Sequence, residues 1–337
     1  MGDVGAAPLR IGQVGTKHGH AAGKWKALRS NPDVDAVGIW EPDAEARAAR
    51  QADGSYPEAR WCDSFDELLG DPSVVALAIE GRNDESLAMA HAAIDAGKHL
   101  WYDKPAGDDW PGFQELMAKA RTRERYIQMG YMFRYQPGFG QIMDWATSGA
   151  LGDVYSVRAH MSMGITVEAR SIQSVHVGGI FYDLGGHMLD QVVWLLGRPA
   201  RITRVFRNDA TPEYPSYVDN AVCVFEFERA LAFVDISSLE PRPPARRFEI
   251  YGTRGTAITE PFDHARVATL TLGEPWGDCA AGTHAVDPEV VPRQQMYKRE
   301  IAAFVGVLRG AHPPDRTPEH ELLVQETLLR ATGRIPE

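Results

Sequence analysis

Two acids and a histidine lie at helical spacing in the middle of the chain. Asp183 and His187 are four residues apart, and Asp190 follows three residues later, so a helix presents all three on one face. A histidine titrates near neutrality and can take the proton of a hydroxyl group, while a neighbouring carboxylate orients its ring. A structural hydrogen bond, or a metal site with Asp190 as the third ligand, would explain the same spacing.

Lys104 is the other residue with evident chemistry, because it follows an apolar stretch, His99–Tyr102, that is typical of a strand. Ligands of open parallel sheets bind at the carboxyl ends of strands, where an ammonium group can polarise a substrate oxygen. A Lys-Pro pair at a strand end is also a common turn. Oxidation of a secondary alcohol requires a base for the proton and a cation for the developing oxyanion. Lys104, Asp183 and His187 are therefore predicted to be catalytic and to bind substrate.

A glycine-containing turn joins the strand predicted at Leu9–Val14 to a helix predicted at Ala21–Ser30. Free N–H groups and the helix dipole at such a helix start suit a pyrophosphate. The GxGxxG fingerprint is met only in part, because Lys17 and His20 occupy its second and third glycine positions. Lys17 either offers a cation to the pyrophosphate or is an exposed lysine of the loop. The predicted cofactor contacts in this turn are Gly15, Thr16, Lys17, His18 and Gly19.

The histidines of this turn, His18 and His20, are spaced like a pair of metal ligands. No carboxylate or cysteine lies beside them in the sequence, and a metal site needs three or more ligands. Contact with phosphate or with solvent is therefore the expected role, and no metal is predicted.

Glu41 ends the second predicted strand, Ala36–Trp40, twenty-six residues after Gly15. An acid at this place can accept hydrogen bonds from the adenosine-ribose hydroxyls and would repel a 2′-phosphate. No basic residue follows before Arg47, so NAD is favoured over NADP. The alternative is that Glu41 merely caps the helix that starts near Asp43.

The order of elements predicts two domains, 1–130 and 131–337. The first alternates strands with helices and is expected to be a doubly wound, parallel Rossmann sheet. After Gly130 successive strands lack intervening helices, which predicts an α+β domain with a large, mainly antiparallel sheet. The expected elements of the first domain are strands at 9–14, 36–40, 74–79, 99–102 and 126–129, with helices at 21–30, 44–53, 65–69, 85–96 and 110–123. Those of the second are helices at 139–148, 182–196, 294–309 and 318–332, with strands at 154–161, 202–208, 221–228, 231–237 and 247–251.

Three segments resemble the Gfo/Idh/MocA family of glucose–fructose oxidoreductase, inositol dehydrogenase and rhizopine-catabolism proteins. Residues 93–105, AIDAGKHLWYDKP, resemble its segment ALEAGKHVLVEKP. Residues 130–137, GYMFRYQP, resemble its GxxxRxxP, and residues 178–190, GGIFYDLGGHMLD, match its GGxxxDxGxHxxD. The chain departs from the family in the glycine turn, in Asp103 where the family has glutamate, and in residues 81–86, which keep only Asn83 of TPNxxH.

The resemblance implies NAD as cofactor and hydride transfer between nicotinamide and a secondary alcohol carbon of a sugar, inositol or related polyol. It adds Asn83, Asp103 and Lys104 to the cofactor contacts and Arg134 to the substrate contacts, although an interdomain structural arginine is an equal alternative. Relatives that use NAD for transient oxidation during elimination or glycoside cleavage provide a second hypothesis. A non-catalytic NAD-binding sensor is a third, against which the retention of Lys104, Asp183 and His187 speaks.

Composition restricts the partners and the compartment. The formal net charge is −11 with 35 basic residues, so neither nucleic acid nor a membrane surface is an expected partner. Three widely spaced cysteines and the absence of a signal-peptide pattern predict a cytoplasmic location. Residues 221–228 carry apolar side chains on both strand faces, Val222 and Val224 among them. We therefore expect a partner subunit's sheet to cover one face in a homodimer or homotetramer.

Overall fold

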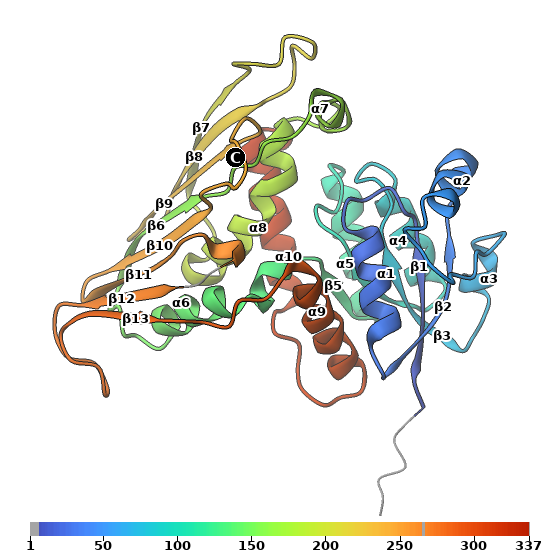
Figure 1. Cartoon of the computed structure of the whole chain (residues 1–337), viewed down its shortest axis with the longest axis horizontal. Coiled ribbons are helices and arrows are strands. Elements are labelled where there is room, and N and C mark those ends of the chain that lie inside the picture. Colours follow the sequence, from blue (N-terminus) through green and yellow to red (C-terminus); the bar gives the residue numbers. More distant parts are fainter. Residues whose placement is uncertain (1–6, 265–266, 337) are drawn as a thin grey trace, which may run out of the picture. The chain divides into compact units, whose positions relative to one another are not determined.

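The computed structural model describes residues 7–264 and 267–336, and the chain divides into two compact units (Figure 1). Of the described residues, the first unit comprises 7–130 together with Gln294–Leu322, and the second comprises 131–264, 267–293 and 323–336. The change of pattern at Gly130 predicted a single second domain for 131–337. The segment 294–322 differs from that expectation because its helix packs with the first unit.

The first unit is built on five parallel strands in the order β2-β1-β3-β4-β5. The strands are β1 (Leu9–Val14), β2 (Val34–Trp40), β3 (Val74–Ile79), β4 (His99–Tyr102) and β5 (Ile127–Met129). The helices are α1 (Ala21–Ser30), α2 (Ala44–Ala52), α3 (Asp66–Leu69), α4 (Ser86–Asp95), α5 (Trp110–Thr122) and α9 (Arg293–Leu308). This sheet confirms the predicted Rossmann class.

The strand order changes direction at β1, which has β2 on one side and β3 on the other. Ligands of doubly wound sheets bind at such a switch point, beyond the carboxyl ends of the strands. The turn after β1, Glu41 after β2, Glu80 after β3 and Asp103 after β4 all lie at this edge. The fold therefore brings the predicted cofactor residues to one place.

The second unit contains an eight-stranded sheet in the order β13-β12-β11-β10-β6-β9-β8-β7, in which only β6 and β9 pair in parallel. The strands are β6 (Val154–His160), β7 (Arg201–Arg207), β8 (Asn220–Glu226), β9 (Leu231–Ser237), β10 (Arg247–Gly252), β11 (Gly255–Thr259), β12 (Ala268–Leu272) and β13 (Gly282–Val286). The helices are α6 (Pro137–Thr147), α7 (Val167–Gln173), α8 (Gly179–Leu196) and α10 (Pro318–Thr332), the last beginning in the first unit, and short 3₁₀ turns are η1 (Met132–Tyr135) and η2 (Phe262–His264). The mainly antiparallel sheet confirms the prediction, whereas α7 and β11–β13 were not foreseen.

The helices of the second unit cover one face of this sheet (Figure 1). Side chains that alternate along β8 and β9 toward that face, such as Phe225 and Val234, are fully buried. On the opposite face Val222 and Val224 are half-buried, and Phe233 is 40% exposed. In the described part of the chain, no helix has the length and apolarity that a membrane span requires.

Candidate active site

The turn after β1 requires glycine at its first position. Gly15 has a φ of 85°, and a Cβ there would lie 2.4 Å from the backbone nitrogen of Gly81. Its own N–H donates to the carbonyl of Trp40 at 2.8 Å. A Cβ at Gly19 would meet no heavy atom within 4 Å. Close backbone approach therefore explains Gly15, and open space lies beside Gly19.

Glu41 ties this turn to the end of β2. One of its carboxylate oxygens accepts both the N–H and the hydroxyl of Thr16, each at 2.7 Å, and the other accepts the N–H of Asp43 at 3.1 Å. The cap of α2 is Asp43, whose side chain accepts from the N–H groups of Glu45 and Ala46. Glu41 therefore does not cap the helix, and it lies at the end of β2 where the ribose contact is predicted.

Lys17 is not an exposed lysine of the loop, since its side chain is only 18% exposed, and its contact with the pyrophosphate stays a prediction. Its ammonium group lies 2.9 Å from the Asp43 carboxylate and 3.1 Å from that of Glu85. Burial opposes its charge, but the hydrogen bonds to Asp43 and Glu85 outweigh burial and raise the pKa of Lys17 above its ordinary value. The side chain thus bridges the segments that follow β2 and β3, and its charge is balanced by two acids.

Asp103 draws both histidines of the turn together. Its Oδ2 lies 3.1 Å from Nδ1 of His18 and 2.9 Å from Nδ1 of His20. Burial lowers the pKa of His20 to about 4, against the attraction of Asp103, so this ring is neutral at physiological pH. The three ligand atoms lie within 4.8 Å of one another and could hold a metal ion. The sequence did not indicate this cluster, because Asp103 is 83 residues from His20.

A fully buried lysine of α1, Lys24, stands behind the cluster. Its ammonium lies 3.2 Å from both Asp103 and Glu80 and 4.3 Å from the centre of the Trp101 ring. Burial disfavours every charge here, yet the neighbouring acids raise the pKa of Lys24 above its ordinary value. The pKa of Asp103 lies well below its usual range, because the attraction of His18, Lys24 and His20 outweighs the effect of burial. Burial raises the pKa of Glu80 well above its usual range. The favoured charge pair of this cluster is therefore Lys24 with Asp103.

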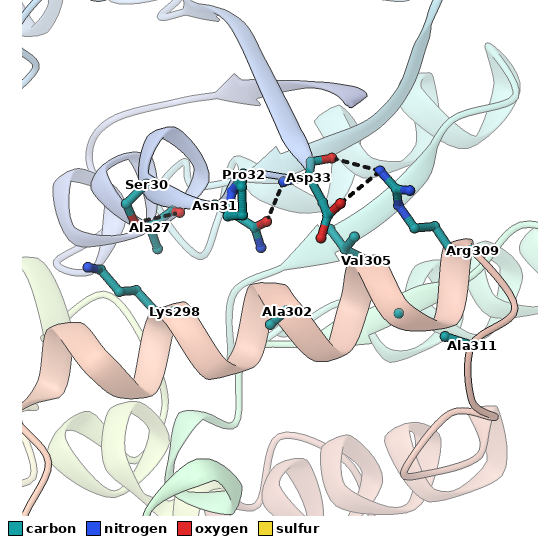
Figure 2. A pocket seen from close by; sticks show the side chains of 11 residues that line it. Ala27, Ser30, Asn31, Pro32, Asp33, Lys298, Ala302, Val305, Arg309 and Ala311 are labelled. Carbon is teal, nitrogen blue, oxygen red and sulfur yellow. Dashed lines mark hydrogen bonds and ion pairs between the residues drawn. The ribbon is translucent and has the colours of Figure 1, made fainter. Parts of the chain in front are cut away.

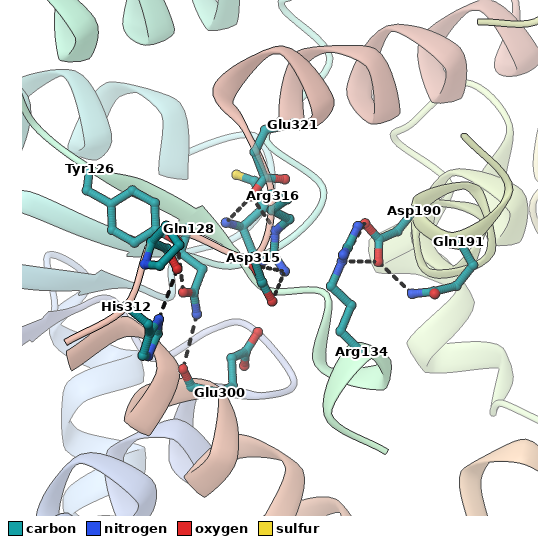
Figure 3. Close-up of polar contacts among 12 residues, drawn as sticks. Tyr126, Gln128, Arg134, Asp190, Gln191, Glu300, His312, Asp315, Arg316 and Glu321 are labelled. Carbon is teal, nitrogen blue, oxygen red and sulfur yellow. Dashed lines mark hydrogen bonds and ion pairs between the residues drawn. The ribbon is translucent and has the colours of Figure 1, made fainter. Parts of the chain in front are cut away.

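Glu300 on α9 adds a third buried acid to this group. The side chain is fully buried, and among the described residues neither of its carboxylate oxygens has a hydrogen-bond partner. Burial raises its pKa to about 7, with Lys24 opposing and Asp103 adding to the shift. Figure 3 shows Glu300 beside Gln128, whose amide donates to the Glu300 main-chain carbonyl at 3.1 Å.

Lys104 lies directly after β4, at the edge predicted from its sequence position. Its backbone N–H donates to Asp103 Oδ1 at 2.7 Å, and the residue is 2% exposed. Asn83 lies half-buried in the turn between β3 and α4, and its carbonyl oxygen is 3.0 Å from where a Cβ at Gly107 would be. The first unit thus gathers the predicted cofactor residues of four strand ends, whereas their contacts with NAD remain predictions.

The second unit carries Asp183 and His187 on α8. The Asp183 carboxylate accepts a hydrogen bond from the Gln173 amide at 2.8 Å, and Gln173 in turn accepts one from the Tyr217 hydroxyl at 2.9 Å. The ring of His187 meets that of Phe133 edge to face, with 4.9 Å between centres, and the residue is 2% exposed. Helix α7, which provides Gln173, is the part of this site that sequence reasoning missed.

Arg134 and Asp190 form a buried ion pair within the second unit (Figure 3). Three hydrogen bonds of 2.8 to 3.0 Å join the Arg134 guanidinium to both carboxylate oxygens of Asp190. The Gln191 amide donates to Oδ2 of Asp190 at 2.7 Å. The guanidinium also lies 4.4 Å from the centre of the Trp194 ring. Asp190 is therefore bound to a cation, which argues against its use as a metal ligand, and Arg134 has a structural role beside its predicted substrate contact.

A groove of about 420 Å³ lies elsewhere in the first unit (Figure 2). The end of α1, the turn after it and α9 line the groove, and Arg309 at its rim pairs with Asp33 at 3.1 Å. The C-terminal end of α1 is at the amino edge of the parallel strands. The groove is therefore at the opposite edge of the sheet from the cofactor turn.

Comparison with known proteins places these features in a family. The family model described as an oxidoreductase family with an NAD-binding Rossmann fold matches residues 9–131, and the model of the GFO/IDH/MocA C-terminal domain matches residues 139–258. The chain belongs to the Gfo/Idh/MocA family of oxidoreductases. This membership confirms the resemblance predicted from the sequence, and NAD is the cofactor of its Rossmann fold.

Members of the Gfo/Idh/MocA family match nearly the whole chain. An uncharacterized oxidoreductase of Rhizobium meliloti, ORF334, is 27% identical over 315 residues, which cover 90% of each chain. The scyllo-inositol 2-dehydrogenase (NAD(+)) of Bacillus subtilis is 26% identical over 338 residues, covering 98% of this chain and 93% of the relative. GenD2 from gentamicin A biosynthesis, solved in complex with NAD, has the same fold, with a TM-score of 0.79 at 23% identity over 99% of this chain and 96% of its own.

Proposed function

We propose that the protein is an NAD-dependent dehydrogenase that transfers a hydride between nicotinamide and a secondary alcohol carbon of a sugar, inositol or related polyol. The observation that carries the proposal is the meeting of the glycine turn, Glu41 and Lys104 at one edge of a Rossmann sheet. The inositol dehydrogenase among the relatives supports the substrate class. That the protein is an oxidoreductase follows already from its family membership.

The residues of the first unit fit NAD. Helix α1 has no acidic residue in its first turn, and the side chain of the residue before it does not cap it, so its N-terminus suits an anion. The space beside Gly19 leaves room for the pyrophosphate. Glu41 is 4% exposed and acidic, and we infer that it accepts the ribose hydroxyls and disfavours a 2′-phosphate. Bound NAD would supply the hydride acceptor.

The remaining chemistry is proton transfer by the chain's own groups. In the proposed mechanism Lys104 donates a hydrogen bond to the substrate oxygen and stabilises its developing negative charge. His187 takes the hydroxyl proton, and Asp183, held by Gln173, stabilises the resulting imidazolium. Lys104 and His187 are each 2% exposed, so the packing around them restricts both side chains and favours a preorganised site.

A panel of polyols and sugars tests the substrate class. Purified protein is mixed with NAD and each compound, and absorbance of the reduced cofactor is followed. Saturable reduction with at least one secondary alcohol is the expected result. Cofactor binding without reduction on any compound would favour the sensor, and product formation without net reduction would favour transient oxidation during elimination or glycoside cleavage.

We further propose that the protein is a cytoplasmic homo-oligomer in which a second copy covers the open face of the eight-stranded sheet. Val222, Val224 and Phe233 line neighbouring positions of β8 and β9 on that face, with Val224 paired directly with Phe233. Apolar side chains in contact with one another across strands mark an association surface. A copy of the same sheet offers a matching apolar face.

A further inference from the structure

We infer that His20 binds the cofactor turn to Asp103, so that the turn and the strand end carrying Lys104 form one hydrogen-bonded unit. The inference rests on the proposed function, because it names positioning residues for that site. Asp103 Oδ2 lies 2.9 Å from Nδ1 of His20 and 3.1 Å from Nδ1 of His18. His18 Nδ1 accepts the backbone N–H of His20 at 3.2 Å, so His20 is the histidine that donates to Asp103. The other oxygen, Oδ1, accepts the Lys104 N–H at 2.7 Å. One carboxylate thus joins the turn to the backbone of Lys104.

The imidazole of His20 and the short side chain of Asp103 complement each other sterically. His20 occupies the third glycine position of the dinucleotide fingerprint, so its imidazole extends from the turn toward β4. Asp103 is 3% exposed, and a Cβ at Gly130 would lie 2.5 Å from its Oδ1 and 2.9 Å from the Lys24 ammonium. This close packing leaves no space for an extra methylene. Glutamate at position 103 would therefore displace His20, and glycine at position 20 would release that space.

The protonation of the cluster is compatible with hydrogen bonding at neutral pH. A neutral His20 can carry its proton on Nδ1 and donate it to Asp103, as the 2.9 Å distance requires. The Lys24 ammonium lies 3.2 Å from the same oxygen and supplies the positive charge. A metal ion is the competing occupant of these ligands. Like-charge repulsion from a buried ammonium so close to a ligand oxygen opposes that occupant.

A double-mutant cycle on the full chain tests the inference through the affinity for NADH, measured by fluorescence titration without substrate. His20→Gly and Asp103→Glu should each weaken binding about tenfold or more. The double variant should bind about 5- to 100-fold more tightly than the product of the single effects predicts. His20→Asn, which keeps an N–H donor near the position of Nδ1, should stay within about threefold of wild type.

The matched control is Asp66→Glu, at an exposed acid in the first turn of α3, which should combine additively with His20→Gly. Additive effects of His20→Gly and Asp103→Glu in a wild type that binds NADH would overturn the inference and leave the proposed function intact. Failure of wild type to bind NADH would instead overturn the proposed function and, with it, the inference. If purified wild type contains stoichiometric zinc and Asp103→Asn does not, the cluster is a metal site and the inference of a hydrogen-bonded unit is wrong. If His20→Gly fails to fold, the cycle is repeated with His20→Ala and the same criteria.

Discussion

Replacing Glu300 by glutamine should stabilise the protein at alkaline pH and change its stability little in acid. The carboxyl group is fully buried without a hydrogen-bond partner, and burial raises its pKa from 4.5 to about 7. Glutamine is close to the shape of the protonated acid and cannot ionise. The variant therefore removes the free-energy cost, at alkaline pH, of keeping the Glu300 carboxyl protonated or of burying its negative charge.

The sign and size of the effect follow from proton linkage. Between pH 4.5 and about 7 the folded state holds a proton on Glu300 that the unfolded state has released, so the free energy of unfolding falls as the pH rises through this window. Each pKa unit corresponds to about 1.4 kcal/mol. The wild type should thus lose about 3 kcal/mol from this group by pH 8, and at pH 5 it should have lost less than about 1 kcal/mol.

Thermal unfolding of wild type and Glu300→Gln at pH 5 and pH 8.5 measures this difference. A melting-temperature change of about 2 °C per kcal/mol predicts that the variant gains about 6 °C relative to wild type at the higher pH. Glu319→Gln, at an exposed acid in the first turn of α10, is the control and should show no such dependence. A difference between Glu300→Gln and wild type that is the same at both pH values would refute the reasoning, since it would mean that Glu300 is ionised in the folded protein at acidic pH.

The remaining predictions concern cofactor choice, catalysis and assembly. Calorimetric titration should show tighter binding of NAD than of NADP, and Glu41→Ser should narrow the difference; equal or tighter NADP binding by wild type would contradict the role of Glu41. Lys104→Met and His187→Ala should each lower turnover on an authentic substrate by ~10²–10⁴-fold while NAD affinity changes much less, and near-normal turnover of either variant would remove that residue from the mechanism. Light scattering at micromolar concentration should show an oligomer that Phe233→Lys dissociates, because the substitution places a charge on the open sheet face; a monomeric wild type would exclude the proposed assembly.

Local patterns in the sequence were sufficient for the scaffold. Short apolar runs predicted β1, β3 and β4, and alternation predicted β9, with the bounds that the structure has. The strands β11, β12 and β13 were missed because each is only five residues long. Their pairing with one another, rather than any strong pattern of their own, makes them strands.

The placement of Lys104 at a strand end and of Asp183 and His187 on one helix face could be predicted from spacing, because periodicity within one element fixes which side chains point together. Sequence alone did not indicate the partners that constrain the site. Asp103 meets His18 and His20 from the end of β4, although β3 lies between β4 and β1 in the sheet. Lys24 on α1 pairs with the Asp103 carboxylate, and Glu300 on α9 lies in the same buried group. Such groups become neighbours only when the sheet forms, and their protonation depends on how much water the packed structure excludes, so tertiary structure decided both.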